Sequence, residues 1–249
     1  MVRYSFLSLA ALGILLTPQA FAAEELSQDK VKQLIAEYIQ QHPEEILQSL
    51  DNYQLEQARL EEEVAQQALA ENMEFFDGDG VPTVGNPDAD IHVVEFYDYN
   101  CGYCKRAFSD VAMLLEEDEN VKVTLVDMPI LGPSSQLAAE WSLAAKNQGA
   151  DKFFEFHSAL MKNPGTKNEG VLEMLAEKAG LDLEQLKKDL EDPEIVPHLD
   201  ENKRMAAEIG VRGTPAFIVN GELFRGYLGY DGLKAVIKDK RDALSESES

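Results

Sequence analysis

The stretch Ile91-His92-Val93-Val94-Glu95-Phe96-Tyr97, followed after a short turn by Cys101-Gly102-Tyr103-Cys104, decides the fold. Its first part is a nearly continuous apolar run, which is typical of a largely buried strand. After the cysteines, apolar residues recur at the spacing of one helix face: Ala107, Phe108, Val111, Ala112, Leu114 and Leu115. The sequence therefore predicts a strand, a tight turn and a helix that begins at Cys101.

Downstream of this helix the chain continues as a second strand over 121–127 and a long helical block over about 134–209. Breaks in the block are expected at Gly149, Pro164-Gly165, Gly180 and Pro193. Two short apolar runs, 216–219 and 222–225, then flank Asn220-Gly221, the strongest short signal for a β-hairpin. This order predicts an α/β layer fold, in which a parallel central pair of strands is extended by a hairpin and covered by helices on both faces.

The predicted domain covers residues 77–244, with the helical block inserted at about 134–209. We expect Asp231 to cap a last helix that runs to about Ala243, and the acidic tail 245–249 to be disordered. Trp141, inside the helical block, is most simply a core residue.

An acidic helical arm is predicted before this domain, over residues 23–76. Ser27 is a plausible N-cap, His42-Pro43 breaks the arm, and a second helix could run to about Glu74. The second helix carries a heptad seam, formed by Ile46, Leu50, Tyr53, Gln57, Leu60, Val64 and Gln67. The seam could pack on its own domain or on another copy of the chain. We favour self-association through residues 28–74, because the arm has no core of its own.

The first 22 residues differ from the rest of the chain. Arg3 is their only charged side chain, 6–16 is mostly apolar, and Ala20-Phe21-Ala22 fits the small-x-small rule for signal peptidase. The apolar run is too short to span a bilayer. We therefore expect 1–22 to be a signal peptide that is cleaved after Ala22, and the mature protein to be periplasmic with no membrane insertion.

The charge of the chain excludes some classes of partner. Its 46 acidic residues outnumber 22 Lys and Arg, which leaves a formal net charge of −24. Binding to nucleic acid or to an anionic membrane surface requires a basic face. We therefore expect neither partner, and interpret the acidic residues as a soluble, self-repelling surface.

Cys101 and Cys104 are the two cysteines of the chain, so no long-range disulfide can form. A bridge between them closes a very short loop, worth about 2 kcal/mol, against about 4.7 kcal/mol for a 100-residue loop. The pair is therefore better suited to chemistry than to stabilisation. At a helix start, free N–H groups and the helix dipole lower the pKa of the leading thiol, while the trailing thiol lies one turn inside to resolve a mixed disulfide.

A metal site is the main competing interpretation of the cysteine pair. The four histidines show no ligand spacing near it: His42, His92, His157 and His198. We interpret each of them as structural or solvated, and expect neither a resident metal nor a cofactor.

The run from Glu95 to Arg106, followed far downstream by Gly213-Thr214-Pro215-Ala216-Phe217, resembles the DsbA-like thiol–disulfide oxidoreductases of the thioredoxin superfamily. With its helical arm, the chain is most similar to the ScsC/Com1-like branch. The resemblance implies a thioredoxin fold with a helical insertion, and it implies Cys101 as nucleophile and Cys104 as resolving thiol.

The same resemblance implies further site residues. It implies a cis bond between Thr214 and Pro215, packed beside the cysteines and pairing with substrate backbone. Glu95 matches the buried acid of the family, which could take the proton of Cys104. The alternative for Glu95 is a solvent-facing strand residue, although its apolar neighbours favour burial.

The residues between the cysteines depart from the strong oxidases of the family, which carry histidine where Tyr103 stands and often proline where Gly102 stands. The Gly102-Tyr103 pair is similar to that of the periplasmic disulfide isomerases, so we expect a weaker lowering of the thiol pKa and a less oxidising couple. The resemblance thus favours a disulfide isomerase or mixed isomerase/oxidase, which acts on unfolded or misdisulfided exported proteins and is reduced by a membrane partner.

Two other functions stay open at this point. The first is a monomeric dithiol oxidase recharged by a quinone-linked membrane partner. The second is a copper-stress-linked protein whose thiols bind Cu(I), since soft thiolates suit that ion. Lys105 and Arg106 could supply positive potential at the thiolate or simply form a solvated helix face. Tyr227 and Tyr230 could be packing residues or a rim for unfolded substrate.

Overall fold

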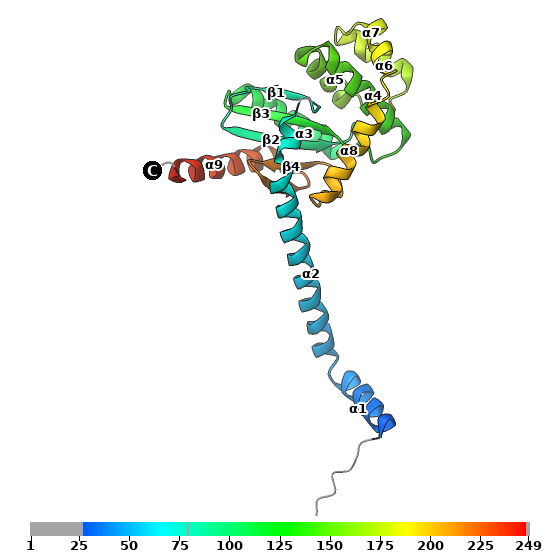
Figure 1. Cartoon of the computed structure of the whole chain (residues 1–249), viewed down its shortest axis with the longest axis vertical. Coiled ribbons are helices and arrows are strands. Elements are labelled where there is room, and N and C mark those ends of the chain that lie inside the picture. Colours follow the sequence, from blue (N-terminus) through cyan, green and yellow to red (C-terminus); the bar gives the residue numbers. More distant parts are fainter. Residues whose placement is uncertain (1–26, 79, 248–249) are drawn as a thin grey trace, which may run out of the picture. The chain divides into compact units, whose positions relative to one another are not determined.

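The computed structural model describes residues 27–78 and 80–247, and Figure 1 shows how their helices and strands are arranged. The predicted signal peptide, 1–22, lies outside the described residues. The chain divides into two compact units between Leu55 and Glu56. Within the described ranges, no helix is both long and apolar enough to cross a membrane.

The first unit carries α1, Gln28–Gln41, and the beginning of α2, Pro43–Glu71. Ser27 caps α1 as predicted, because its hydroxyl accepts a hydrogen bond from a backbone N–H three residues on, at 3.3 Å. His42 ends α1 and Pro43 opens α2, which confirms the predicted break. Proline suits this position because the first N–H groups of a helix have no partner within it.

The apolar seam predicted along α2 is largely exposed. Its apolar members are between 39% and 66% exposed: Ile46, Leu50, Tyr53, Leu60 and Val64. Helix α1 likewise contains no buried residue. Most helical stability in proteins comes from covering an apolar face, so this part of the chain lacks its usual source of stability.

The last turns of α2 belong to the second unit. Leu69 is 1% exposed, and the 3-10 helix η1, Met73–Asp77, buries Phe76 completely. Burying each of these side chains stabilises the fold by about 1.5–3 kcal/mol. The predicted boundary at residue 77 is therefore too late, because the second unit begins inside α2. The helix itself ends at Glu71, slightly before the predicted end near Glu74.

A five-stranded sheet forms the centre of the second unit, in the order β1-β3-β2-β4-β5. The bounds are β1 Thr83–Gly85, β2 Ile91–Tyr97, β3 Val121–Asp127, β4 Ala216–Val219 and β5 Glu222–Arg225. β2 and β3 are parallel, and the other three pairs are antiparallel. The predicted parallel pair and hairpin are thus confirmed, and the architecture is α/β.

Strand β1 was not predicted from the sequence. It has only three residues, too few for an alternating pattern to be recognised, and the last of them, Gly85, is of a type depleted in strands. Pairing with β3 supplies what the local pattern lacks: Thr83 lies opposite Thr124, and their hydroxyls are 2.9 Å apart.

Seven α-helices accompany the sheet in the second unit (Figure 1). They are α3 Gly102–Glu117, α4 Pro133–Ala145, α5 Ala150–Lys162, α6 Glu169–Lys178, α7 Leu183–Asp189, α8 Ile195–Glu208 and α9 Gly229–Ser247, with a short 3-10 helix η2, Lys146–Gln148, after α4. Helices α4 to α8 form the predicted insertion between β3 and β4, and the predicted breaks fall between them. Trp141 is buried in α4 as expected.

The sheet has a core on each face because β2 is buried on both sides. Val93 and Tyr97 face one core together with α3, α4, α5 and α9. Val94 and Phe96 face the other core, together with α8 and the end of α2. Strand alternation therefore assigns Glu95 to the same face as Tyr97, beneath α3.

Helix α9 differs from its prediction at both ends. It begins at Gly229, so Asp231 lies in its first turn instead of capping it. It continues past Ala243 to Ser247, which corrects the expected disorder of 245–247. In this last stretch the Ser245 hydroxyl donates a hydrogen bond to the Asp242 carbonyl at 2.7 Å. The final two residues of the predicted tail lie outside the described part of the chain.

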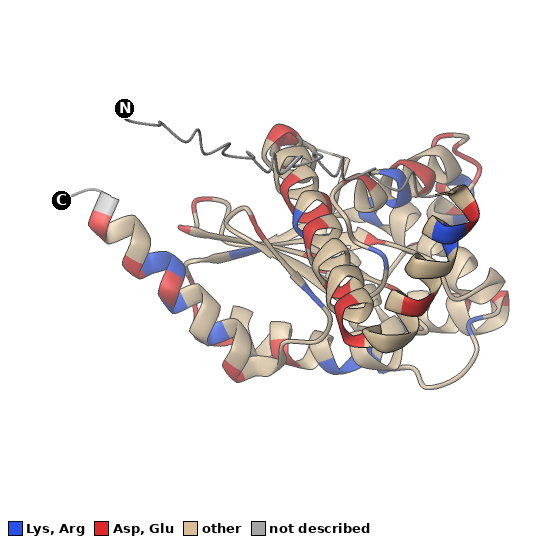
Figure 2. Cartoon of the chain, turned by 90° about the horizontal axis from the view of Figure 1, so that it is seen from below, with Lys and Arg blue, Asp and Glu red and all other residues tan. Residues whose placement is uncertain are grey.

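The acidic character of the sequence is visible over the whole chain, where Asp and Glu are spread along many helices and Lys and Arg are fewer (Figure 2). Several arginines are paired with carboxylates, as in the contacts of Arg241 with Asp90 at 2.8 Å and with Asp118 at 2.6 Å. These pairs link the start of β2 and the end of α3 to α9.

Candidate active site

The two cysteines lie at the start of α3, as predicted. Cys101 occupies the N-cap position and is 9% exposed, whereas Cys104 lies one turn inside the helix and is fully buried. The unbonded N–H groups of the first turn and the helix dipole favour negative charge on the leading sulfur. The geometry thus separates an accessible thiol from a shielded one.

The electrostatics of the two thiols are strongly asymmetric. The pKa of Cys101 is lowered to about 5, chiefly because its sulfur accepts a hydrogen bond from the Cys104 thiol. Burial opposes this shift, whereas the backbone N–H groups of Cys104 and Tyr103 add to it. The pKa of Cys104 is raised well above its ordinary range by the same hydrogen bond and by burial. Cys101 is therefore the thiol that carries a negative charge at neutral pH.

Thr214 and Pro215 are brought to the cysteines by the pairing of β4 with β2. Glu95 lies opposite Phe217 in that pairing, so the loop before β4 runs beside the turn after β2. The Thr214–Pro215 peptide bond is cis, as the resemblance implied. The Sγ atom of Cys101 lies 3.3 Å from the carbonyl oxygen of Thr214.

Gly102 and Tyr103 present an open surface next to the leading sulfur. Apart from its two chain neighbours and the nearby backbone of α3, no atom lies within 4 Å of the position that a Cβ at Gly102 would occupy. The Tyr103 ring is 57% exposed and lies 6.1 Å from the ring of Tyr227, and the Arg106 guanidinium lies over it at 5.2 Å.

Tyr227 belongs to this rim and not to the core. It is 40% exposed, and its hydroxyl donates a hydrogen bond to Asp110 at 2.7 Å. Tyr230 is different, because its ring packs at the edge of the core and its hydroxyl bonds to Glu117. The structure thus separates two tyrosines that the sequence could not distinguish.

Glu95 is buried beneath α3, in agreement with the prediction from its apolar neighbours. It is 1% exposed, and its Oε1 atom has no hydrogen-bond partner among the described residues. Burial raises the pKa of this carboxyl to about 8, and the charges of Asp110 and Cys101 add to the shift. The carboxyl group is therefore mostly neutral at pH 7 and titrates just above it.

A buried carboxylate, Asp98, holds the turn between β2 and α3. Its Oδ1 atom accepts hydrogen bonds from the Asn100 backbone N–H and the Ser135 hydroxyl, both at 2.7 Å. Its Oδ2 atom accepts two more, from the backbone N–H groups of Ile130 and Leu131. The sequence offers no signal for this network, since its members come from two segments, 98–100 and 130–135, that are distant along the chain.

The histidines are not gathered around the cysteines. His92 bonds to Thr124 at 2.8 Å on the opposite face of the sheet, and His157 is buried against Tyr99, whose hydroxyl lies 2.9 Å from Nδ1. Burial lowers the pKa of His157 to about 3, which keeps its ring neutral. His42 lies at the end of α1, and His198 lies on α8. The described residues contain no group of three His, Cys, Asp or Glu side chains that could hold a metal ion.

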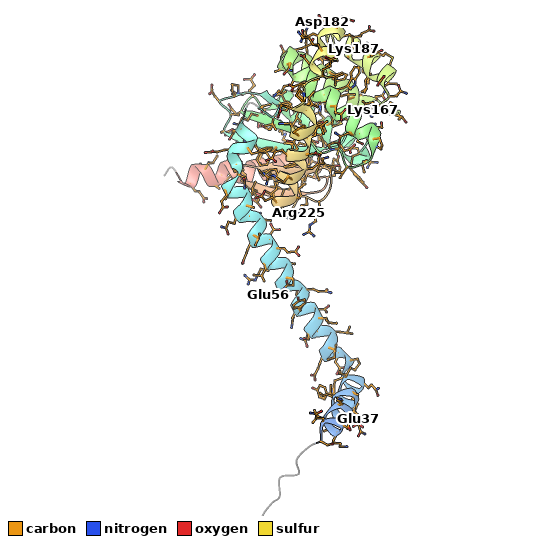
Figure 3. The ribbon with its side chains drawn as sticks, turned by 45° about the vertical axis from the view of Figure 1, so that its right-hand side comes forward. Glu37, Glu56, Lys167, Asp182, Lys187 and Arg225 are labelled. Atoms are coloured by element: carbon orange, nitrogen blue, oxygen red, sulfur yellow. The ribbon has the colours of Figure 1, made fainter. Side chains whose placement is uncertain are left out.

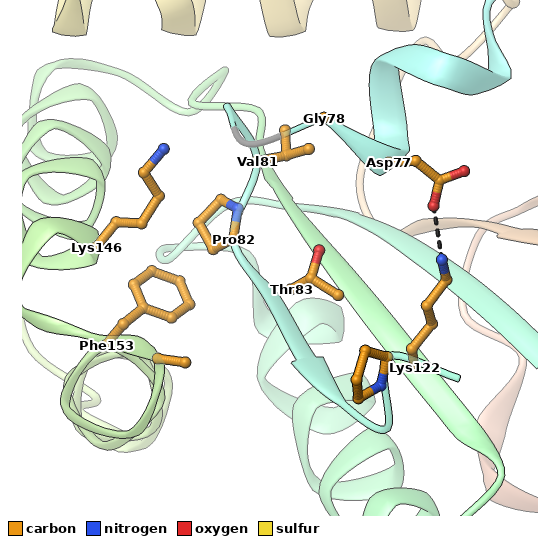
Figure 4. Close-up of a pocket in the computed structure, with 10 residues that line it drawn as sticks. Asp77, Gly78, Val81, Pro82, Thr83, Lys122, Lys146 and Phe153 are labelled. Atoms are coloured by element: carbon orange, nitrogen blue, oxygen red, sulfur yellow. Dashed lines mark hydrogen bonds and ion pairs between the residues drawn. The ribbon is translucent and has the colours of Figure 1, made fainter. Parts of the chain in front are cut away.

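A pocket of about 400 Å³ lies apart from the cysteines, and Figure 4 shows its lining. Lys122 and Asp77 on its wall are paired at 2.7 Å. Phe153 and Lys146 lie on the other side, and Lys146 donates to the Gly80 carbonyl at 3.0 Å. None of the predicted site residues lines this pocket.

The family of the chain follows from comparison with known proteins. Residues 92–238 match the model of the DSBA-like thioredoxin domain, which spans the cysteine pair, the insertion and the cis-proline loop. The chain therefore belongs to the DSBA-like thioredoxin domain family. It is a thioredoxin-like fold with a helical insertion, preceded by the helices α1 and α2.

Individual relatives agree with this assignment. The disulfide bond formation protein D of Bacillus subtilis is 30% identical over 169 residues, which cover 64% of this chain and 76% of that protein. A Na(+)/H(+) antiporter NhaA 1 of Salinispora arenicola is 33% identical over 155 residues. That match covers 61% of this chain but only 24% of the antiporter, so it says nothing about transport by this chain.

Three solved structures are similar to the second unit. A thioredoxin-like oxidoreductase from Silicibacter pomeroyi is 40% identical, with a TM-score of 0.63, and covers 67% of this chain and 95% of its own. The catalytic domain of Proteus mirabilis ScsC is 27% identical, with a TM-score of 0.65 and coverages of 70% and 97%. A periplasmic thioredoxin-like protein from Salmonella enterica serovar Typhimurium is 29% identical, with a TM-score of 0.58 and coverages of 66% and 92%.

Proposed function

We propose that this member of the DsbA-like thiol–disulfide oxidoreductases acts in the periplasm as a disulfide isomerase, or a mixed isomerase and oxidase, on exported proteins. The observation that carries the proposal is the asymmetry of the two thiols. A thiol of pKa about 5 at the N-cap of a helix, 9% exposed, attacks disulfides as a thiolate at neutral pH, and a fully buried neutral thiol lies one turn away.

In the proposed reaction, the Cys101 thiolate attacks one sulfur of a substrate disulfide. A bond forms between these two sulfurs, and the other substrate sulfur leaves as a thiolate. In isomerisation, a second substrate thiolate displaces Cys101, so the substrate exchanges one disulfide for another without net electron transfer. In net reduction, Cys104 loses its proton and displaces the substrate sulfur, which leaves a Cys101–Cys104 disulfide and a reduced substrate.

Glu95 is the proposed acceptor of the Cys104 proton. Only the ionised carboxylate can accept a proton, and with a pKa of about 8 a minor fraction of Glu95 is ionised at pH 7 and more as the pH rises, close to the working pH that suits a general base. Its position beneath α3, on the face shared with the buried thiol, supports this role.

The proposed substrate site consists of the open surface at Gly102 and Tyr103 and the loop at Thr214 and Pro215. The Thr214 carbonyl lies 3.3 Å from the attacking sulfur, so an extended substrate segment that pairs with this loop would bring its disulfide to Cys101. Backbone pairing reads no side chains, which suits an enzyme that acts on many unfolded or misdisulfided exported proteins.

The arm is proposed to join several copies of the chain through residues 28–74. Support comes from the exposed seam of α2 and from the absence of any buried residue in α1. Several catalytic domains around one cleft would favour binding of misfolded chains, because the second contact of a bound substrate becomes intramolecular. A membrane reductase is the proposed source of electrons that keeps Cys101 reduced.

A dithiol oxidase is the second candidate, and the lowered pKa of Cys101 favours it. Stabilising the thiolate stabilises the reduced enzyme, and this makes the disulfide form more oxidising. The redox state of the protein in cells separates the two candidates, since an oxidase is held mainly oxidised and an isomerase mainly reduced.

The deciding assay offers the purified protein two forms of one multi-disulfide substrate, one reduced and one with scrambled disulfides. We expect rescue of the scrambled form in a mildly reducing buffer, with no rescue by Cys101→Ser. Oxidation of the reduced form without any rescue of the scrambled form would contradict the isomerase and leave the oxidase. A protein that does neither would contradict both.

A further inference from the structure

Lys167 is a buried lysine at the active-site end of the insertion, in the loop between α5 and α6 (Figure 3). Lys167 is only 1% exposed. A buried ammonium group is costly unless hydrogen bonds or an opposite charge compensate for lost hydration. In a chain with 46 acidic residues a carboxylate would be the expected partner.

The hydrogen bonds of the Lys167 ammonium instead go to neutral oxygen atoms. It donates to the Asn100 side-chain carbonyl at 3.2 Å, to the Asn163 backbone carbonyl at 3.3 Å and to the Gly165 carbonyl at 3.4 Å. Two of these acceptors belong to its own loop. The third, Asn100, precedes Cys101 directly, so one hydrogen bond joins the insertion to the residue before the attacking thiol.

Asn100 is in turn fixed on its other side. Its Nδ2 atom donates to the Ser135 hydroxyl at 2.9 Å, and that hydroxyl donates to Asp98 at 2.7 Å. The Asn100 backbone N–H donates to the same carboxylate oxygen. The side-chain amide of Asn100 therefore bridges Lys167 and Ser135, and Ser135 links it to Asp98 in the turn that leads into α3.

A second lysine converges on the same loop. Lys105, which follows Cys104, donates to the Asn163 carbonyl at 2.5 Å. Burial and the charge of Lys105 lower the pKa of Lys167 to about 8, whereas the charge of Asp98 opposes the shift. Lys105 comes from α3 and Asp98 from the turn before it.

We propose that Lys167 is a positioning residue for thiol–disulfide exchange, acting through Asn100 on the turn that carries Cys101. This inference rests on the proposed function. The thiolate of Cys101 depends on backbone N–H groups of the first turn of α3, and their direction depends on the turn before the helix. The insertion thereby helps to set the thiol pKa, and with it the reduction potential of the pair.

The test compares Lys167→Met with Lys178→Met, which removes the same charge from an exposed position on α6 of the same insertion. The pKa of Cys101 is measured from the pH dependence of its alkylation rate. We expect Lys167→Met to raise the pKa of Cys101. At a pH below the Cys101 pKa of both proteins, the variant should contain about threefold to tenfold less thiolate than the wild type. Lys178→Met should leave this pKa unchanged.

The potential is measured by equilibration with glutathione, in which two glutathione molecules give two electrons and two protons to the enzyme disulfide and become glutathione disulfide. The Lys167→Met equilibrium is expected to shift about threefold to tenfold toward the oxidised enzyme, because the thiolate form is less favoured. Asn100→Ala is expected to act in the same direction, and Lys167→Met should add nothing in that background.

Unchanged thiol pKa and glutathione equilibrium in Lys167→Met would overturn the proposal. Should that variant fail to fold, Asn100→Ala decides alone, and a wild-type thiol pKa in it would overturn the proposal equally. A merely structural lysine would lower the stability of oxidised and reduced forms alike without moving either readout. Loss of the proposed function is recognised separately, as absence of exchange by the wild-type protein.

Discussion

The turn before α3 and the seam along α2 differ in how far their side chains find partners within one chain. In the turn, Asp98 alone accepts four hydrogen bonds, and the polar groups around Cys101 are held by residues of the same chain. Along α2, apolar side chains such as Tyr53 and Val64 are more than 60% exposed. The comparison teaches that one chain supplies the partners of the proposed chemistry, whereas it leaves the apolar face of the arm exposed, and this exposure is the basis on which self-association is proposed.

The largest expected effect is a loss of exchange activity at the turn that leaves the assembly of the arm unchanged. Cys101→Ser should abolish exchange, a loss of at least about a thousandfold, because an alcohol at this position is neither ionised nor able to form a disulfide. Light scattering should give the same molar mass as for the wild type, since the substitution does not touch the arm. Cys104→Ser is the matched variant, and it should accumulate a mixed disulfide at Cys101. Residual exchange in Cys101→Ser would show that Cys101 is not the nucleophile.

Glu95→Gln tests whether the buried carboxyl accepts the proton of Cys104. Resolution of the mixed disulfide should slow by about a hundredfold, because Cys104 loses its proposed proton acceptor while the shape of the side chain is kept. Phe217→Leu, opposite Glu95 in the sheet, offers a control for packing. Unchanged resolution in Glu95→Gln would limit the carboxyl to a structural role.

The same variant makes a prediction about pH. The pKa of Glu95 is raised to about 8 in the folded chain, so the unfolded chain releases this proton first as pH rises from about 4.5. The stability that the neutral carboxyl contributes is thus full below pH 4.5 and is lost as pH rises through 8. In urea unfolding of the oxidised protein, the wild type should lose stability relative to Glu95→Gln between pH 5 and pH 8. Parallel pH profiles of the two proteins would contradict the burial of a titrating carboxyl.

The smallest expected effect on chemistry lies in the arm. Leu50→Glu places a charge in the exposed seam, and it should convert the assembled protein to single chains and reduce rescue of scrambled substrate by about tenfold. Oxidation of reduced substrate should stay at the wild-type rate. Gln48→Glu adds the same charge to α2 outside the seam and should change neither property. Equal molar masses for the wild type and Leu50→Glu would contradict self-association through the seam, and a single-chain mass for both would contradict self-association altogether.

The predictions from sequence succeeded where a local pattern determines the structure. The apolar run of β2, the helical spacing after Cys101 and the Asn220-Gly221 turn each specify their own element, and all three are present. The burial of Glu95 could be inferred because its neighbours are apolar. The cis bond before Pro215 was implied only by the resemblance, since most X-Pro bonds are trans.

What the sequence could not predict depends on contacts between distant segments. Strand β1 exists because β3 offers it a partner, and the end of α2 joins the domain because Leu69 and Phe76 find a core there. Lys167 carries no local signal at all, since its role follows from the folded position of Asn100, 67 residues earlier. The ends of α9 were misjudged because Asp231 resembles a cap and the serine-rich tail resembles disorder.

The empty space beside Gly102 has a consequence for how such proteins can diverge. A Cβ at this first position of α3 would meet no atom within 4 Å beyond its chain neighbours and the nearby helix backbone, and proline is favoured at the first position of a helix. Gly102→Pro could therefore be accepted without rearranging the scaffold. Selection or a protein engineer can therefore exchange the residue at position 102, next to the attacking thiol, while the architecture around it stays the same.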